Sequence, residues 1–361
     1  MRYKPMLSSL AANLDPYFRE LAEQARFSGV VRITQGEQEL FADAYGYASR
    51  AWKVPNTLEM RFDTASITKV FTAVATLQLI ERGLLSFDTS VIDLLQLRGT
   101  QISPDVTLYH LLTHSSGIAD DAEEEAGESY EAIWQNQPNY RVTQTADFLP
   151  NFVYKPANFA PGAGCRYCNC GYVLLGLALE RVTGMSYRDY VMQQLFAPAG
   201  ISDSGFFHKA EVHERLAEGC DPIQDDTGQV LGWKRNIYSF PPIGSPDGGA
   251  YVTAADLDRF MRAVQQGKLL SPSMTKIFFT PQVLYRDHGD WQIVYGHGIW
   301  FRIDKMNGKI VCYQKEGFNP GVSGMIRCFP EQEIHVVILS NMQEGAWEPI
   351  RKIHDLITEQ K

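Results

Sequence analysis

The strongest indication of the fold lies in nine residues that lead into a predicted helix, Phe62-Asp63-Thr64-Ala65-Ser66-Ile67-Thr68-Lys69-Val70. Ser66 stands three residues before Lys69, at the point where the helix is expected to begin. Apolar residues then recur at positions 70, 71, 74, 77 and 80, which is helical spacing. Because residues three apart share a helix face, we expect the Ser66 hydroxyl and the Lys69 amine to face one cleft. A serine at a helix start also lies at the positive end of the helix dipole, which favours a developing alkoxide.

The Ser-x-x-Lys spacing is found in acyl-transfer enzymes that use a serine nucleophile and a lysine base. The same spacing recurs by chance in many helices, so an ordinary helix start with a solvated lysine is the alternative. A lysine base also has a physical requirement. Its reference pKa is about 10.4, so the neutral amine near pH 7 costs roughly 4 kcal/mol. Burial, a neighbouring cation or a phenol that shares the proton can supply that shift, and the chain is expected to contain such a partner.

Two later stretches offer such partners. In the first, Tyr167 and Asn169 come just before an apolar helix predicted over residues 172–182. The second is the end of a predicted strand, Gln314-Lys315-Glu316-Gly317-Phe318. A glycine there lets a substrate lie against the strand edge. The Phe318 N–H is therefore predicted to be one donor to the oxyanion of the reaction, and the Ser66 N–H the other.

The three pairs Ser66-x-x-Lys69, Tyr167-x-Asn169 and Lys315-x-Gly317 together resemble the motifs of the serine β-lactamase and penicillin-binding protein superfamily. The Tyr-x-Asn form is similar to class C β-lactamases, D,D-peptidases and the related family VIII esterases. Residues 111–118, 172–176 and 248–253 resemble further landmarks, and the order agrees from about residue 25 to 350. The resemblance implies an α+β fold of the β-lactamase/transpeptidase type, in which an antiparallel sheet flanked by helices meets a mostly helical inserted domain.

The resemblance also implies a serine hydrolase that cleaves a carboxylic ester or amide bond and needs no cofactor or metal. Ser66 would attack the carbonyl carbon, while Lys69 and Tyr167 move its proton to the leaving group. Water activated by Tyr167 would then release the acyl-enzyme. Asn169 would orient Lys69 or a substrate amide. Lys315 would lower the pKa of Tyr167 through its positive charge.

Glu316 departs from the pattern, because the middle position of the third motif usually carries a hydroxyl residue. If its side chain lines the cleft, a substrate carboxylate at ~4 Å would meet a repulsion of about 4 kcal/mol at an effective dielectric near 20. Neutral esters or amine-bearing amides would then be preferred. Strand alternation gives the other interpretation, in which Glu316 points away from Lys315 and from the site. Both interpretations stay open at this point.

Three substrate classes compete within the hydrolase prediction: cell-wall D-Ala peptides, β-lactams, and simple esters or D-amino-acid amides. A small molecule or a peptide is thus the expected partner. A non-catalytic sensor or scaffold that recognises penicillin is the alternative from another class, and its sequence would be expected to lack a motif residue. Only the position of Glu316 departs from the motifs, so catalysis is favoured.

Composition limits the remaining possibilities. The 361 residues are 45% hydrophobic and 21% charged, which is typical of a globular protein with two lobes. A formal net charge of −9 argues against nucleic-acid binding, and the absence of an 18-residue apolar run argues against a membrane span. The N-terminal residues lack the apolar segment of a secretory signal. A cytoplasmic location is therefore expected, or a periplasmic or extracellular one if a leader has been removed. The oligomeric state is not predicted.

Periodicity predicts helices over residues 10–25, 254–267 and 347–359 and strands over 27–33, 39–45, 299–304, 309–315, 322–329 and 334–339. The N-terminal hairpin is too small to be stable alone, so we expect it to join the C-terminal strands in one sheet. Residues 1–85 and 245–361 would form one discontinuous α/β domain and residues 86–244 a mostly helical insertion, with the active site between them. The acidic segment 120–130 is predicted to be a solvated loop.

The cysteines and histidines give no independent site. Cys165-x-x-Cys168-x-Cys170 resembles a metal cluster, but a fourth ligand is not evident and the overlap with the tyrosine motif explains its position. Cys312 and Cys328 fall on neighbouring predicted strands, where they could face each other as reduced thiols. His114 is predicted to be a packed, hydrogen-bonded histidine, although His110 stands four residues before it. The segment 286–288 is predicted to be a polar loop, and Trp300 is one of several aromatic residues that could line a pocket.

Overall fold

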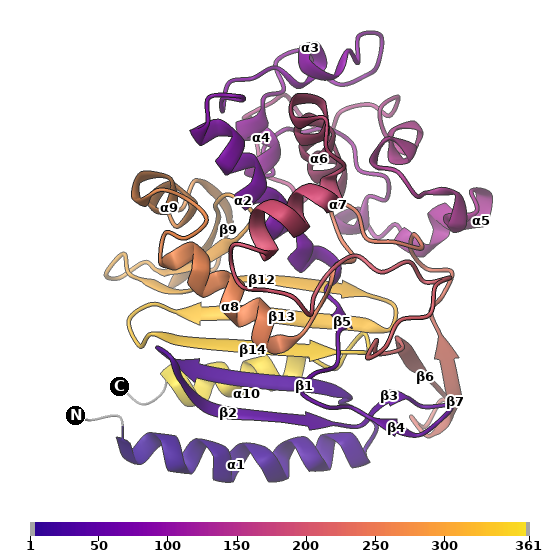
Figure 1. The fold of residues 1–361 in the computed structure, drawn as a ribbon, viewed down its shortest axis with the longest axis vertical. Helices are drawn as coiled ribbons and strands as arrows, with labels where there is room; N and C mark the ends of the chain where they lie inside the picture. Colours follow the sequence, from indigo (N-terminus) through magenta and orange to yellow (C-terminus); the bar gives the residue numbers. More distant parts are fainter. Residues whose placement is uncertain (1–3, 359–361) are drawn as a thin grey trace.

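The computed structural model describes residues 4–358, and an antiparallel sheet of eight strands forms its centre (Figure 1). The strand order is β2-β1-β14-β13-β12-β11-β10-β9. These strands are β1 (Gly29–Gln35), β2 (Gln38–Tyr45), β9 (Val283–Asp287), β10 (Trp291–Tyr295), β11 (Trp300–Asp304), β12 (Ile310–Asn319), β13 (Val322–Phe329) and β14 (Ile334–Ser340). Residues 1–3 and the predicted helix end at Glu359 lie outside the described residues.

The N-terminal hairpin joins the C-terminal strands, as predicted. Strand β1 pairs antiparallel with β14, from Gly29 opposite Ser340 to Gln35 opposite Ile334. Strand β14 is buried along its whole length, because it is a central strand with cores on both faces. Strand β9, by contrast, is a largely exposed edge strand. Its residues show little hydrophobic pattern, which is why Arg286 and Asp287 were wrongly predicted to lie in a loop.

Alternate residues of the central strands supply two separate cores. Val336 and Ile338 pack with α1 (Lys4–Glu23) and α10 (Trp347–Thr358) on one face. Val337 and Leu339 pack on the other face, where α8 (Ala254–Gln265) crosses the sheet and α9 (Pro272–Phe278) lies nearby (Figure 1). The period-2 alternation of a strand with two buried faces accounts for this division.

The same alternation corrects the prediction about two cysteines. Cys328 lies opposite Tyr313 in the register of β12 and β13, so Cys312 is one residue out of step with it. The two thiols therefore point to opposite faces and pack in different cores. All six cysteines are free thiols.

Helix α2 (Thr68–Glu81) follows a 3-10 turn over Ala65–Ile67 that contains Ser66. Its residues are buried on every side from Thr68 to Leu79, as expected for a helix surrounded by other elements. A short ladder between β5 (Phe62–Asp63) and β8 (Tyr251–Val252) fixes the chain just before the turn.

Residues 86–244 hold short helices, 3-10 turns and the hairpin of β6 and β7, which the sequence did not predict. The longest helix here is α6, which packs against α2 and α4 above the sheet edge (Figure 1). The division into two domains at these limits stays a prediction. The elements are α3 (Val91–Leu95), α4 (Leu108–Leu112), α5 (Ile133–Asn136), α6 (Asn169–Thr183), α7 (Tyr187–Tyr190), β6 (Cys220–Gln224) and β7 (Val230–Arg235), with β3 (Tyr47–Ser49) and β4 (Val54–Pro55) earlier in the chain.

None of the helices within residues 4–358 is long and apolar enough to cross a membrane.

Close contact at Gly176 fixes α6 against the segment that follows Gly244. A Cβ at Gly176 would lie 2.1 Å from Cγ of Pro246, so Gly176→Ala forces one of the two segments to move. We expect this variant to lose about 1–3 kcal/mol of unfolding free energy, measured by chemical denaturation. Gly171→Ala in the same helix is the control, because its Cβ would meet Leu111 at an ordinary 3.6 Å. Equal stability of the two variants would show that this contact does not hold α6 in place.

Candidate active site

The turn that carries Ser66 is strained and held from several sides. Ala65 has φ of +42°, in the left-handed region that residues other than glycine rarely adopt. The Asp63 carboxylate accepts a hydrogen bond from the Ala65 N–H at 2.8 Å, and the Thr64 hydroxyl donates to the Ala250 carbonyl at 2.7 Å. Such strain persists only where the surroundings enforce it, and it is common at functional sites. The turn presents Ser66 to a cleft.

Lys69 lies directly beneath Ser66 and is fully buried. Its Nζ donates to Ser66 Oγ at 3.1 Å, to Asn169 Oδ1 at 2.8 Å and to the Asp247 carbonyl at 2.6 Å. Burial lowers the pKa of Lys69 below its usual value, and the charges of Asp247, Asp120 and Glu124 oppose that change. The predicted shift toward a neutral amine is therefore present, and burial is its main cause.

Tyr167 and Lys315 complete the polar centre. Lys315 Nζ lies 3.4 Å from the Tyr167 hydroxyl and 4.5 Å from the centroid of its ring. Burial lowers the pKa of Lys315 to about 8, although the charge of Glu316 opposes this. Burial also raises the pKa of Tyr167 well above its usual value, against a hydrogen bond with Ser66. Burial is the largest cause of this rise, so the effect of the Lys315 charge on the Tyr167 pKa stays a prediction.

His114 holds the loop that carries Tyr167, and the prediction of a packed, hydrogen-bonded histidine is confirmed. Its ring lies 4.6 Å from the Tyr167 ring. Its Nδ1 accepts from the Cys168 N–H at 3.2 Å, and its carbonyl accepts from the Arg166 N–H at 2.9 Å. Burial and the nearby cations lower the pKa of His114 well below its usual value, so the ring is neutral.

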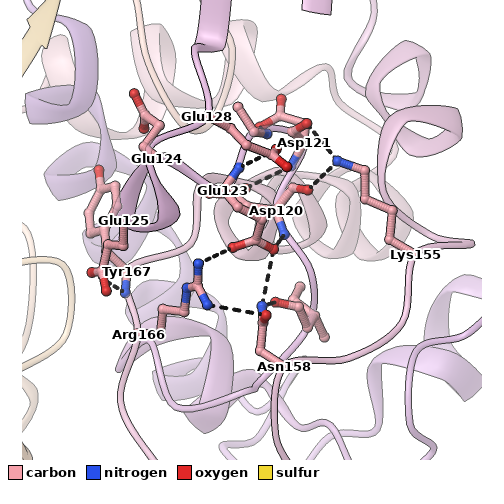
Figure 2. Close-up of polar contacts among 12 residues, drawn as sticks. Asp120, Asp121, Glu123, Glu124, Glu125, Glu128, Lys155, Asn158, Arg166 and Tyr167 are labelled. Atoms are coloured by element: carbon pink, nitrogen blue, oxygen red, sulfur yellow. Dashed lines mark hydrogen bonds and ion pairs between the residues drawn. The ribbon is translucent and has the colours of Figure 1, made fainter.

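The acidic segment is solvated only in part, because residues 124–129 are exposed as predicted but the first residues of the segment are not. Asp120 and Asp121 are buried, and the segment lies along the loop that precedes α6 (Figure 2). The Asp120 carboxylate accepts from the backbone N–H groups of Asn169 at 2.8 Å and Cys170 at 2.9 Å, at the positive end of the helix. Charge density alone predicts solvent exposure. It gives no sign of partners nearly fifty residues away.

The end of β12 carries Phe318, whose N–H is predicted to be an oxyanion donor. Strand β11 pairs with β12 only as far as Gln314, so residues 315–319 leave an open edge. The two-residue loop between Asn319 and Val322 makes these residues a hydrogen-bonded pair. Hydrogen-bonded and non-hydrogen-bonded pairs alternate along an antiparallel ladder, so the Phe318 N–H points away from β13. It points to the open edge of β12, which borders the cleft. Strand β12 runs four residues beyond its predicted end because β13 pairs with it along that length.

Glu316 lies at the cleft, which decides between the two interpretations of its position. Its carboxylate accepts from the Trp300 indole N–H at 2.5 Å, and both residues line the cleft. The contact with Trp300, at the start of β11, directs the Glu316 side chain toward the cleft even though it alternates with Lys315 along the strand. Its charge also raises the pKa values of Lys315 and Tyr167.

A cavity of about 400 Å³ lies over these groups. Lys69 lies beneath the floor of this cavity. The other predicted site residues line it: Ser66, Tyr167, Asn169, Lys315, Glu316, Gly317 and Phe318. Trp300, which the sequence analysis named as one of several aromatic residues that could line a pocket, belongs to the wall. Several charged residues of the wall were missed because they lie outside any motif: Asp63, Glu124, Glu125, Lys209, Asp247 and Arg286.

Gly317 sets the distance between β12 and the Ser66 turn. A Cβ there would lie 2.1 Å from the Thr64 carbonyl and 2.9 Å from the Ser66 nitrogen. We expect Gly317→Ala to move the strand edge from the turn and to reduce kcat/KM by about 100-fold or more, because a shift near 1 Å has that effect on catalysis. Gly232→Ala, in strand β7, is the control, since its Cβ meets Ile223 only at 3.9 Å. Unchanged ester hydrolysis by the Gly317 variant would contradict this packing argument.

Comparisons with known proteins agree with this geometry. The chain is 27% identical to a penicillin-binding protein of Bacillus subtilis (strain 168), over 92% of this chain and 72% of that protein. It is 30% identical to Esterase EstB of Burkholderia gladioli, over 72% of this chain and 71% of the esterase. A crystal structure of a penicillin-binding protein from Bacillus halodurans superposes with a TM-score of 0.85 and 36% identity, covering 93% of this chain and 99% of that one. The family model described as Beta-lactamase matches residues 14–356, and the chain therefore belongs to the beta-lactamase family of serine hydrolases, with the predicted α+β fold.

Proposed function

We propose that this hydrolase cleaves a carboxylic ester or amide through an acyl-enzyme on Ser66, with Lys69 as the base. The observation that carries the proposal is the buried Lys69 amine, 3.1 Å from Ser66 Oγ and with a lowered pKa. A base must lie within hydrogen-bond reach of the proton that it removes and be available in its neutral form. Lys69 lies within hydrogen-bond reach of the Ser66 hydroxyl, and its burial favours the neutral amine.

In the first step Lys69 takes the proton of Ser66 while Oγ forms a bond to the carbonyl carbon. The negative charge that develops on the carbonyl oxygen would be stabilised by the N–H groups of Ser66 and Phe318. The proton then passes to the leaving group as its bond to carbon breaks. Tyr167 is placed to deliver it, because its raised pKa keeps the phenol protonated and its hydroxyl contacts Ser66.

Deacylation runs the same transfers with water. A water molecule gives its proton to the Tyr167–Lys69 pair as its oxygen attacks the acyl carbon, and Ser66 Oγ regains a proton on departure. Asn169 would keep Lys69 in place between the two steps, since its Oδ1 accepts from Lys69 Nζ at 2.8 Å. Lys315, which stays largely protonated below about pH 8, would orient the substrate or the Tyr167 hydroxyl.

We further propose that neutral esters or amine-bearing amides are preferred over carboxylate-bearing β-lactams and cell-wall peptides. Glu316 stands where related enzymes usually have a hydroxyl residue, and it lines the cleft together with Glu124 and Glu125. A substrate carboxylate beside Lys315 would meet these like charges. The alternative, a β-lactamase or D,D-peptidase, is supported by the similarity to penicillin-binding proteins.

The test compares the wild type with Ser66→Ala. Both are treated with a fluorescent penicillin and a fluorophosphonate, then assayed with nitrocefin and p-nitrophenyl butyrate. We expect Ser66-dependent fluorophosphonate labelling and ester turnover, with little nitrocefin turnover. Penicillin labelling without ester turnover would favour a penicillin-binding protein instead. Reaction with none of the reagents, or reaction that survives Ser66→Ala, would contradict the assignment of the nucleophile.

The substrate preference is tested at Glu316. We expect Glu316→Thr to raise the ratio of nitrocefin to p-nitrophenyl butyrate turnover by about tenfold or more, because it removes a like charge near the substrate carboxylate. Glu344→Thr is the control, since Glu344 is exposed and does not line the cleft. If the ratio is the same in both variants, Glu316 does not select the substrate.

A further inference from the structure

The acidic segment binds almost every residue of the tyrosine motif loop. Glu123 forms an ion pair with Arg166 at 2.7 Å, and Glu125 accepts from the Tyr167 N–H at 3.3 Å. Asn169 donates from its side chain to both Glu124 and Asp120, each at 3.2 Å. Asp120 makes the most of these contacts, and like Glu123 it does not line the cleft.

Both oxygens of the Asp120 carboxylate are occupied by N–H donors. Oδ2 accepts from the Asn169 backbone at 2.8 Å and from its side chain at 3.2 Å. Oδ1 accepts from the backbones of Cys170 at 2.9 Å and Asp121 at 3.2 Å. Burial raises the pKa of Asp120, and the hydrogen bonds oppose this change because all four are made to an acceptor and favour the ionised carboxylate. Asp120 thus fixes the first turn of α6 and the side chain of its first residue together.

The contact with the Asn169 side chain decides which way the amide points. An amide has donors on one end and an acceptor on the other. With Nδ2 directed at the carboxylates of Asp120 and Glu124, Oδ1 must face Lys69, where it accepts a hydrogen bond at 2.8 Å. The reversed amide would place donors against Lys69 and an oxygen against two carboxylates. A continuous series of contacts therefore leads from Asp120 through Asn169 and Lys69 to Ser66.

We propose that Asp120 is a positioning residue of the reaction, which holds the Asn169 amide in the orientation that directs Lys69 Nζ at Ser66 Oγ. The inference rests on the proposed function, because it acts through the Lys69 base. Asp120 is 3% exposed and does not line the cleft, so its effect should appear in kcat and leave KM unchanged.

Removal of the Asp120 charge is also expected to change the pH dependence of kcat/KM. Charged or titratable groups face Lys69 from α6, β12, the His114 turn, the acidic segment and the Asp247 segment: Asp120, Glu124, Asp247, Cys168, Lys315, His114, Tyr167 and Tyr172. The charge of Asp120 raises the pKa of Lys69 against the larger effect of burial. Removing that charge lowers the Lys69 pKa, so the acid limb of kcat/KM moves to lower pH.

Asp121 offers a matched control, because it is the next residue, is equally buried and also carries a carboxyl group. Its Oδ1 accepts only from the Ala122 N–H, at 3.0 Å, and its Oδ2 has no partner among the described residues. Within residues 4–358, Asn169 forms no hydrogen bond with the Asp121 side chain. We expect Asp120→Asn to reduce kcat for p-nitrophenyl butyrate by about 10- to 100-fold with KM within twofold and an acid limb at lower pH. We expect Asp121→Asn to keep kcat within twofold and the acid limb in place.

The outcomes separate the inference from the proposed function. If Ser66→Ala retains activity, both fail. If Ser66 is essential but the Asp120 and Asp121 variants behave alike, only the inference fails. A fall in kcat with no displacement of the acid limb would likewise assign Asp120 a purely structural role. Should Asp120→Asn not fold, Glu124→Gln replaces it, since Glu124 is the other carboxylate on Asn169 Nδ2 and leaves the α6 amides bound. That variant should show the same displacement, and an unmoved acid limb would overturn the inference.

Discussion

The site depends on the burial of one amine. Lys69 is inaccessible to solvent and is surrounded by oxygen acceptors from three segments of the chain: the Ser66 hydroxyl, the Asn169 amide and the Asp247 carbonyl. A buried ammonium is costly unless it is paired, whereas a neutral amine can donate to two of these oxygens and accept from the Ser66 hydroxyl. The carboxylates nearby favour the charged form and burial favours the neutral one. Their balance determines whether Lys69 can act as a base.

The surrounding fold brings those three segments together at Lys69. Helix α2 carries Lys69, α6 begins at Asn169, and the contact between Gly176 and Pro246 holds the Asp247 segment against α6. Strand β12 approaches from the sheet, where the absence of a side chain at Gly317 allows its backbone to reach the Ser66 turn. Because Gly176 and Gly317 have no side chain, the two segments at each of these contacts can approach closely.

Much of this arrangement could be predicted from the sequence. The spacing of Ser66 and Lys69 and the alternation of the C-terminal strands are local patterns. These patterns were sufficient to place the serine motif, the strand that carries Lys315 and the pairing of the N-terminal hairpin with the sheet. The unpredicted parts depend on distant partners. Acidic residues from 120 onward look like a solvated loop until α6 and Arg166 are brought against them. Likewise, alternation could not show that Glu316 turns back to Trp300 at an open strand edge.

The central claim is that burial brings Lys69 toward its neutral form beside Ser66. The direct test is the titration of the Lys69 side chain by carbon-13 NMR of lysine-labelled protein, with its resonance assigned by comparison with Lys69→Met. The account predicts that Lys69 titrates below the usual lysine value of 10.5. Titration of Lys69 at or above that value would contradict it, because the amine would then remain charged and could not accept the Ser66 proton.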